Sequence, residues 1–276
     1  QYGIECLRRG RFSEAEAGLS EAVAEDANAA EAWFGLGLAR ARLGKMEGAA
    51  EAFAKATALD PTSADYHYNL GLAQQHGGHP EEACLCYERA VAIDPHQAQA
   101  WYNLAIGRSS RGQLAAAMAA FHRLLGLDIP DADRRFAQEK VYALSFLLLA
   151  RGEWTPEAWR GYEVRWDFRP EFIRPDTPFP EWDGRMAPGQ TLLFWPEQGF
   201  GDNIMMFRYA AWLAETRKAE VTVLASPLLR SLFQRGHEAV KVISEIDPAT
   251  HYEAHRPMMG LLQALGVTPT SILSLP

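Results

Sequence analysis

The sequence predicts a two-part protein of mixed class, an N-terminal superhelix of paired α-helices followed by an α/β domain with a parallel sheet. Two observations support this prediction. Side chains of the same kind recur every 34 positions in the first half of the chain. In the second half, an apolar run over 191–195 precedes a glycine-containing loop and an amphipathic run over about 203–217. We therefore expect helical repeats first, then alternating strands and helices.

Composition limits what each part can be. The 276 residues suffice for two modest domains, and 48% hydrophobic residues is typical of a globular protein. A formal net charge of −8 and a pI near 5.5 argue against a nucleic-acid partner. No apolar run approaches the roughly 20 residues of a membrane helix, so we expect no membrane insertion. Three cysteines make no disulfide framework, which favours a cytoplasmic location.

The 34-residue period involves six kinds of position. They are a large residue, a leucine, a glycine, an alanine, an aromatic residue and an aspartate: Trp33, His67, Trp101; Leu36, Leu70, Leu104; Gly44, Gly78, Gly112; Ala49, Ala83, Ala117; Phe53, Tyr87, Phe121; Asp60, Asp94, Asp128. Small residues let two helices approach, the aromatic side chain fills the space between them, and Asp-Pro ends the second helix. This pattern resembles the tetratricopeptide repeat (TPR), with three full units over about 30–129 and a remnant over 2–27.

The TPR resemblance implies a concave face lined by the first helix of each unit. Gly35, Asn69 and Asn103 fall on that face, again 34 residues apart. An amide both donates and accepts, so Asn69 and Asn103 would hold an extended protein or peptide regardless of its sequence. Asparagine is also common at this position of the repeat, and this alternative stays open. Tyr68 and Tyr102 are candidates either for peptide contact or for packing.

Between the two parts, we expect a capping helix over 134–150 and a second helix that starts at Thr155. The second helix carries the aromatic stripe Trp159, Tyr162 and Trp166, for which a buried joint is expected and a sugar-stacking surface is the alternative. Five prolines then forbid regular structure: Pro170, Pro175, Pro178, Pro180 and Pro188. The predicted domains are the repeats over 1–129, capping and connecting helices over 130–168, a proline-rich linker over 169–190, and the α/β part over 191–276.

In the last part of the chain, the sequence predicts strands over 191–195, 220–226 and 240–243 and helices over 203–217, 227–235 and 256–265. Such alternation is typical of a parallel, doubly wound sheet, and 191–276 amounts to a partial lobe. Ligands of these sheets bind at the carboxyl ends of the strands, beside the amino end of the next helix. The loop over 196–202 is therefore the candidate site, and Asp202 falls where a helix N-cap is expected.

Four stretches carry a second, more specific resemblance: Trp159-x-x-Tyr162-Glu163-x-Arg165-Trp166, Pro180–Gly184, Glu197–Asp202 and Arg208–Ala210. In this order they resemble bacterial TPR proteins with a C-terminal domain similar to the heptosyltransferases, glycosyltransferases of the two-lobed GT-B architecture. The resemblance covers nearly the whole chain and implies truncation after the first Rossmann-like lobe. The chain departs from the pattern at Asn203–Met206, where relatives carry Thr-Leu-Gln, and over 255–261.

The resemblance implies transfer of a sugar from a nucleotide-sugar donor to a protein acceptor held by the repeats. The donor-binding lobe would lie outside this chain, which would then be inactive alone. Asp202 corresponds to the catalytic base of the family, although the residues alone fit a helix cap equally well. Glu197 would orient an acceptor hydroxyl or act as a structural carboxylate. Gly199 and Gly201 would present backbone N–H groups to a phosphate.

Arg208 would contact an anionic group of the substrate or pair with Glu197 or Glu163. His251 and His255 lack the pattern of a zinc site, so no metal cofactor is expected. The alternative function is a non-catalytic peptide-binding scaffold with a degenerate lobe. A third hypothesis, an adaptor for C-terminal tails, would need a basic cluster from residues such as Arg42, Arg108 and Arg111.

Overall fold

The computed structural model describes residues 1–168, 175–185, 187, 189–197 and 199–267. The predicted linker over 169–190 thus lies partly outside the described residues. Pro170, Pro188 and the end of the predicted α/β part lie outside them as well. The chain divides into two compact units, Gln1–Leu144 and Ser145–Pro276, which are described separately.

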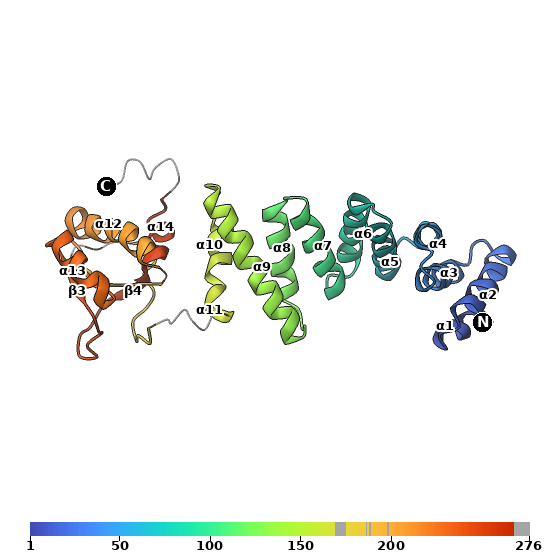
Figure 1. Cartoon of the computed structure of the whole chain (residues 1–276), viewed down its shortest axis with the longest axis horizontal. Helices are drawn as coiled ribbons and strands as arrows, with labels where there is room; N and C mark the ends of the chain where they lie inside the picture. Colours follow the sequence, from blue (N-terminus) through green and yellow to red (C-terminus); the bar gives the residue numbers. More distant parts are fainter. Residues whose placement is uncertain (169–174, 186, 188, 198, 268–276) are drawn as a thin grey trace. The chain divides into compact units, whose positions relative to one another are not determined.

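The first unit is made of helices that follow one another as antiparallel pairs (Figure 1). Their bounds are α1 Tyr2–Arg8, α2 Phe12–Glu25, α3 Ala30–Arg42, α4 Met46–Leu59, α5 Ala64–His76, α6 Pro80–Ile93, α7 Ala98–Ser110 and α8 Leu114–Leu125, and α9 Asp131–Ala150 begins in this unit. Helix α3 packs on α4, α5 on α6 and α7 on α8, and each pair also packs on the next. The paired helices predicted from the 34-residue period are confirmed.

The repeating side chains have the roles that their types predict. A methyl group added at Gly37 would lie 2.5 Å from the ring of Phe53, so only glycine lets α3 and α4 approach this closely. Phe53 is 1% exposed. The turn glycines Gly44, Gly78 and Gly112 have φ of 75°, 84° and 72°, a left-handed backbone that glycine adopts without strain.

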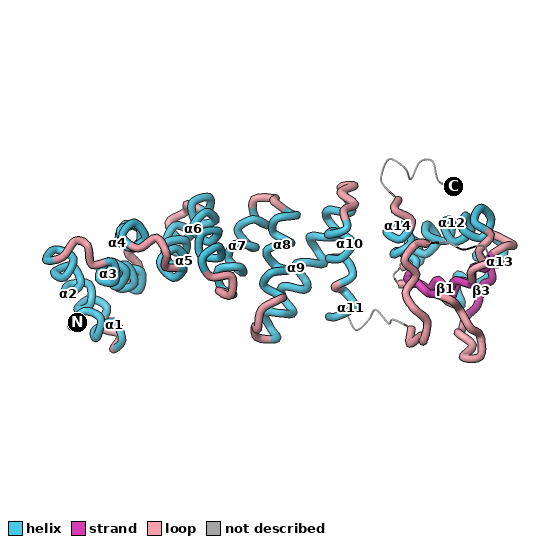
Figure 2. The backbone as a smooth tube through the Cα atoms, turned by 180° about the vertical axis from the view of Figure 1, so that it is seen from behind, coloured by secondary structure: helices cyan, strands magenta, loops and turns pink. Residues whose placement is uncertain are grey.

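The second unit contains helices and, among the described residues, one four-stranded parallel sheet in the order β3-β2-β1-β4 (Figure 2). The strands are β1 Thr191–Trp195, β2 Glu220–Leu224, β3 Val240–Ile243 and β4 Ala254–Pro257, and the helices are α10 Pro156–Glu163, α11 Arg165–Phe168, α12 Phe200–Arg217, α13 Pro227–Gly236, the 3-10 turn η1 Met258–Gly260 and α14 Leu261–Ala264. Helices α12 and α13 pack on each other and on β3, so they cover the same face of the sheet. The predicted parallel sheet is confirmed.

The prediction of a helix over 256–265 is wrong at its start, because Ala254–Pro257 forms β4 beside β1. The polar sequence of β4 concealed a buried strand. His255 accepts a hydrogen bond at Nδ1 from Trp195 Nε1 at 3.0 Å. Arg256 donates to the carbonyl oxygens of Gly260 at 2.8 Å and Trp182 at 2.6 Å. These partners, distant in sequence, replace the hydrogen bonds to water that burial removes.

Two smaller corrections concern helix ends. The N-cap of α12 is Gly199, so Asp202 is the third residue of the helix and the N-cap prediction is wrong. An acid in the first turn still stabilises the helix through its dipole. The aromatic stripe of the predicted connecting helix is divided between α10 and α11 at Val164. The start predicted at Thr155 is confirmed, since its hydroxyl accepts from Ala158 N–H at 3.1 Å.

Candidate functional site

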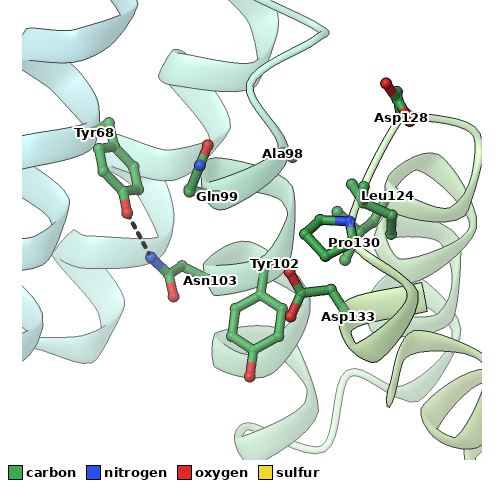
Figure 3. Close-up of a pocket in the computed structure, with 10 residues that line it drawn as sticks. Tyr68, Ala98, Gln99, Tyr102, Asn103, Leu124, Asp128, Pro130 and Asp133 are labelled. Atoms are coloured by element: carbon green, nitrogen blue, oxygen red, sulfur yellow. Dashed lines mark hydrogen bonds between the residues drawn. The ribbon is translucent and has the colours of Figure 1, made fainter. Parts of the chain in front are cut away.

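A hollow of about 320 Å³ lies in the first unit, between α5, α7 and the beginning of α9 (Figure 3). Three of the four residues predicted to bind peptide, Tyr68, Tyr102 and Asn103, line it. Gln99, Tyr102 and Asn103 lie at i, i+3 and i+4 of α7 and therefore share one helix face. Asp133, in the first turn of α9, closes the opposite side. The repeats thus bring an aromatic, an amide and a carboxylate side chain into one concave site.

The two tyrosines both pack and border the hollow. The ring of Tyr68 lies 5.9 Å from that of Tyr87, and the ring of Tyr102 lies 5.5 Å from that of Phe136. Asn103 Nδ2 donates to the hydroxyl of Tyr68 at 3.4 Å, joining α7 to α5 (Figure 3). Burial raises the pKa of the Tyr68 phenol, so this hydroxyl keeps its proton at neutral pH and is a donor as well as an acceptor.

The structure distinguishes two asparagines that the sequence treats as equivalent. Asn69 Nδ2 donates to the backbone carbonyl of Asp65 in its own helix at 2.8 Å. Asn69 is also absent from the described residues that line the hollow. Gly35, at the same position one repeat earlier, packs against Leu19, from which an added methyl group would be 3.2 Å away. Of the two asparagines, Asn103 is therefore the one that lines the hollow, together with the amide side chain of Gln99.

A row of exposed polar residues with the same period was missed by sequence reasoning. Glu31, Asp65, Gln99 and Asp133 are 34 residues apart, and each is the second or third residue of α3, α5, α7 or α9. Gln99 and Asp133 line the hollow, whereas Glu31 and Asp65 are not among its described lining residues. The 34-residue spacing was the signal that could have revealed the row.

In the second unit, Glu197 follows β1, and its side chain is fully buried. Its side chain and that of Arg165 both have an exposed fraction of 0%. Glu197 accepts from Arg165 Nη2 and from the N–H of Met259, the latter at 3.1 Å. Burial raises the pKa of Glu197 to about 7, although the Arg165 guanidinium opposes that rise. Arg165 thus takes the place that the sequence considered for Arg208.

Several contacts fix Arg165 in this position. Its Nη1 donates to the carbonyl oxygen of Tyr162 at 2.6 Å. Its guanidinium carbon lies 3.9 Å from the ring centre of Tyr162 and 4.3 Å from that of Trp166. Trp166 in turn packs on Trp195 at 5.3 Å. These contacts give Glu197 the environment of a structural carboxylate, which was one of its two predicted roles.

The remaining predicted residues lie on α12. Gly199 caps the helix, and Gly201 and Asp202 belong to its first turn. Asp202 is half-buried, whereas Arg208 is exposed and lies 5.5 Å from the ring centre of Tyr209. Gln198, within the predicted loop, lies outside the described residues. Site assignments for Asp202, Gly199, Gly201 and Arg208 therefore stay predictions.

Two further features of the described chain bear on function. No group of three or more His, Cys, Asp or Glu side chains in the described residues is placed to hold a metal ion. None of the described helices has both the length and the apolar character needed to cross a membrane. The arginines considered for an anion site are partly engaged with acids, since Arg108 donates to Glu88 at 2.9 Å and Arg111 lies 3.5 Å from Glu81.

The pairs of antiparallel helices define a helical-repeat protein in the first unit, and comparison with protein families gives the repeat its name. Family models of the tetratricopeptide repeat match residues 3–64 and 64–97. The chain therefore carries tetratricopeptide repeats over 3–97. No curated protein matches the chain.

Solved structures similar to this chain include several repeat proteins. A crystal structure of MamA is 22% identical over 62% of this chain and 96% of its own, with a TM-score of 0.49. YrrB, described as a TPR protein with an unusual peptide-binding site, is 19% identical over 61% of this chain and 84% of its own, with a TM-score of 0.48. The first TPR domain of Spaghetti (RPAP3), bound to an HSP90 peptide, is 22% identical over 40% of this chain and 87% of its own, with a TM-score of 0.39.

Proposed function

We propose that the repeat unit binds an extended segment of a partner protein, with one of its side chains seated in the hollow between α5, α7 and α9. The observation that carries this proposal is that Tyr68, Tyr102 and Asn103 converge on one concave site. The TPR matches support it, because repeats of this kind present the first helix of each pair on a concave surface.

The hollow has the properties that such binding requires. A volume of about 320 Å³ is at the lower end of the range for ligand sites, which suits a side chain rather than a folded domain. Tyrosine rings provide apolar contact area with little loss of conformational entropy. The Asn103 amide and the Tyr68 hydroxyl provide the donors and acceptors that an extended backbone needs.

Selection from a phage-displayed library of random peptides on the immobilised full chain tests this proposal. An enriched peptide is then synthesised with a fluorophore, and its affinity is measured by anisotropy. We expect Tyr102→Ala to weaken binding about tenfold or more, the usual effect of removing an aromatic anchor.

Tyr2→Ala is the matched control, because Tyr2 is 61% exposed and lies on α1, outside the hollow. Circular dichroism spectra establish that both variants are folded. Equal loss of affinity in the two variants, or an enriched peptide that binds Tyr102→Ala as tightly as the natural chain, would refute the proposal.

Sugar transfer by the second unit is a second candidate function. The observation that favours it is the position of Asp202 in the first turn of α12, directly after a strand of a parallel sheet. Because the donor-binding lobe is expected outside this chain, the test uses a longer polypeptide that joins this chain to such a lobe, incubated with a panel of labelled nucleotide sugars and an enriched peptide. We expect label to enter the peptide and Asp202→Ala to abolish incorporation. Undiminished incorporation by folded Asp202→Ala would remove the catalytic-base assignment.

A further inference from the structure

The charge of the hollow indicates which kind of side chain it binds. This inference rests on the proposed peptide binding and goes beyond it. The charged side chains among the described residues that line the hollow are the carboxylates of Asp128 and Asp133. Both are exposed. In Figure 3, Asp133 extends from α9 towards Tyr102, so a negative charge lies next to an aromatic ring. A cationic side chain is attracted by both groups.

The repeat period extends this charge beyond the hollow. Glu31 and Asp65 occupy the positions of α3 and α5 that correspond to Asp133 in α9. Asp65 also accepts from Gln97 Nε2 at 2.9 Å, which places its carboxylate beside the start of α7. A segment lying along the first helices would therefore meet a carboxylate on α3, α5 and α9.

Cations near the hollow are engaged in other contacts. Arg134 donates to the backbone carbonyl oxygens of Leu125 at 3.0 Å and Leu127 at 3.1 Å. Lys140 lies two turns further along α9, where its Nζ is 5.0 Å from the ring centre of Phe136. Arg134 and Lys140 keep their positive charges, but neither is among the described residues that line the hollow, where the charged groups are the carboxylates of Asp128 and Asp133.

We infer that the hollow selects a polypeptide with a basic side chain, lysine or arginine, that lies against the Tyr102 ring with its charge at Asp133. A guanidinium or ammonium group has only donors, and they match carboxylate oxygens, the Asn103 amide oxygen and the Tyr68 hydroxyl oxygen. An acidic side chain in the same place would meet two like charges.

A positional-scanning library of nonapeptides, each pool fixed at its central residue, tests the inference on the full chain. We expect pools with central lysine or arginine to bind about fivefold or more tighter than pools with leucine, which corresponds to about 1 kcal/mol. Pools with central glutamate should bind more weakly than the leucine pools. The preference should shrink in about 0.5 M NaCl, where exposed charges are screened.

Asp133→Lys should abolish the preference for basic pools, and Asp131→Lys is its matched control. Both aspartates are exposed and lie in the first turn of α9, so both reversals perturb the helix dipole alike, but only Asp133 is among the described residues lining the hollow. Asp133→Asn replaces Asp133→Lys if the reversal impairs folding.

Three outcomes would overturn the inference. Equal binding of basic, neutral and acidic pools with sensitivity to Tyr102→Ala would disprove the charge preference and leave peptide binding intact. Equal effects of the two charge reversals would show that Asp133 acts through the helix alone. Absence of binding by every pool would refute the proposed function itself and the charge preference with it.

Discussion

The buried ion pair of the second unit gives the sharpest stability prediction. Removing the acid by Glu197→Leu leaves the Arg165 charge fully buried without its principal partner and also deprives the Met259 N–H of its acceptor. Breaking a buried pair in this way costs about 3–5 kcal/mol. Glu163 Oε1 lies 3.6 Å from Arg165 Nη1 and offers partial compensation, so we expect a loss of about 3 kcal/mol.

The reverse change should cost less. Arg165→Met leaves Glu197 alone, and this carboxyl already has a pKa raised to about 7 by burial. Without Arg165 its pKa rises further, so the group becomes neutral and avoids the cost of a buried charge. Replacing both residues, Arg165→Met with Glu197→Leu, should recover most of the stability lost in Glu197→Leu, because apolar side chains of similar size can fill the site.

Hydrogen exchange measured by mass spectrometry is the appropriate assay. Peptides that span β1 and β4 report the opening free energy of the sheet separately from the repeats. We expect faster exchange there in Glu197→Leu, a smaller increase in Arg165→Met, and near-normal exchange in the double variant. A Glu197→Leu effect below about 1 kcal/mol, or a double variant as unstable as Glu197→Leu, would show that the pair is not the buried interaction described here.

Three further predictions use the same structure. The pKa of Glu197 is higher in the folded chain than the 4.5 of an ordinary glutamate, so the folded state binds more protons between these values. The second unit should therefore lose stability as pH rises from about 5 to 8, by at most about 1.4 kcal/mol per pH unit. The free energy of unfolding is measured by urea titration at each pH, and a value that rises or stays constant with pH would contradict the prediction. His67→Trp should stabilise the repeats by about 1 kcal/mol, because His67 borders a hollow of about 570 Å³ that the larger ring can fill. The equivalent Trp101 bonds the carbonyl oxygen of Pro95, as His67 bonds that of Pro61, so the tryptophan can keep this hydrogen bond. A lower melting temperature of the variant would refute the prediction. Gly37→Ala should lower the melting temperature of the repeats, because the new methyl group would lie 2.5 Å from the Phe53 ring, and an unchanged value would disprove that close approach.

How well the sequence predicted each feature depends on how local its cause is. The turn at Gly44 and the packing of Phe53 depend on residues within one helix pair, so the 34-residue period predicted both correctly. Strand β1 was predicted because its largely apolar run has the length and composition of a buried strand, and four of its five residues are buried. Strand β4 was missed because His255 and Arg256 are buried only through partners far away in sequence.

The candidate site residues, too, were predicted where their cause is local or repeats in the sequence, and missed where it depends on distant partners. Tyr68, Tyr102 and Asn103 were predicted because repeats place equivalent residues on one face, and the structure adds Asp133 from a helix where the repeat signature is weak. The pairing of Arg165 with Glu197 joins residues 32 positions apart, and their sequence surroundings gave no sign of it. Asp202 occupies a position that helix stability alone explains, so its catalytic role can be decided only by a transfer assay.

Photo-crosslinking tests most directly whether the concave site holds a polypeptide. Benzoylphenylalanine placed at Gln99, an exposed residue that lines the hollow, is irradiated with an enriched peptide, and the adduct is mapped by mass spectrometry. The control carries the same group at Glu139, which is exposed and lies further along α9, away from the described lining of the hollow. The proposed function predicts a peptide adduct at position 99 that an excess of unlabelled peptide prevents, and little adduct at 139. Equal adducts at both positions, or none at 99 under conditions where the peptide is bound, would contradict it.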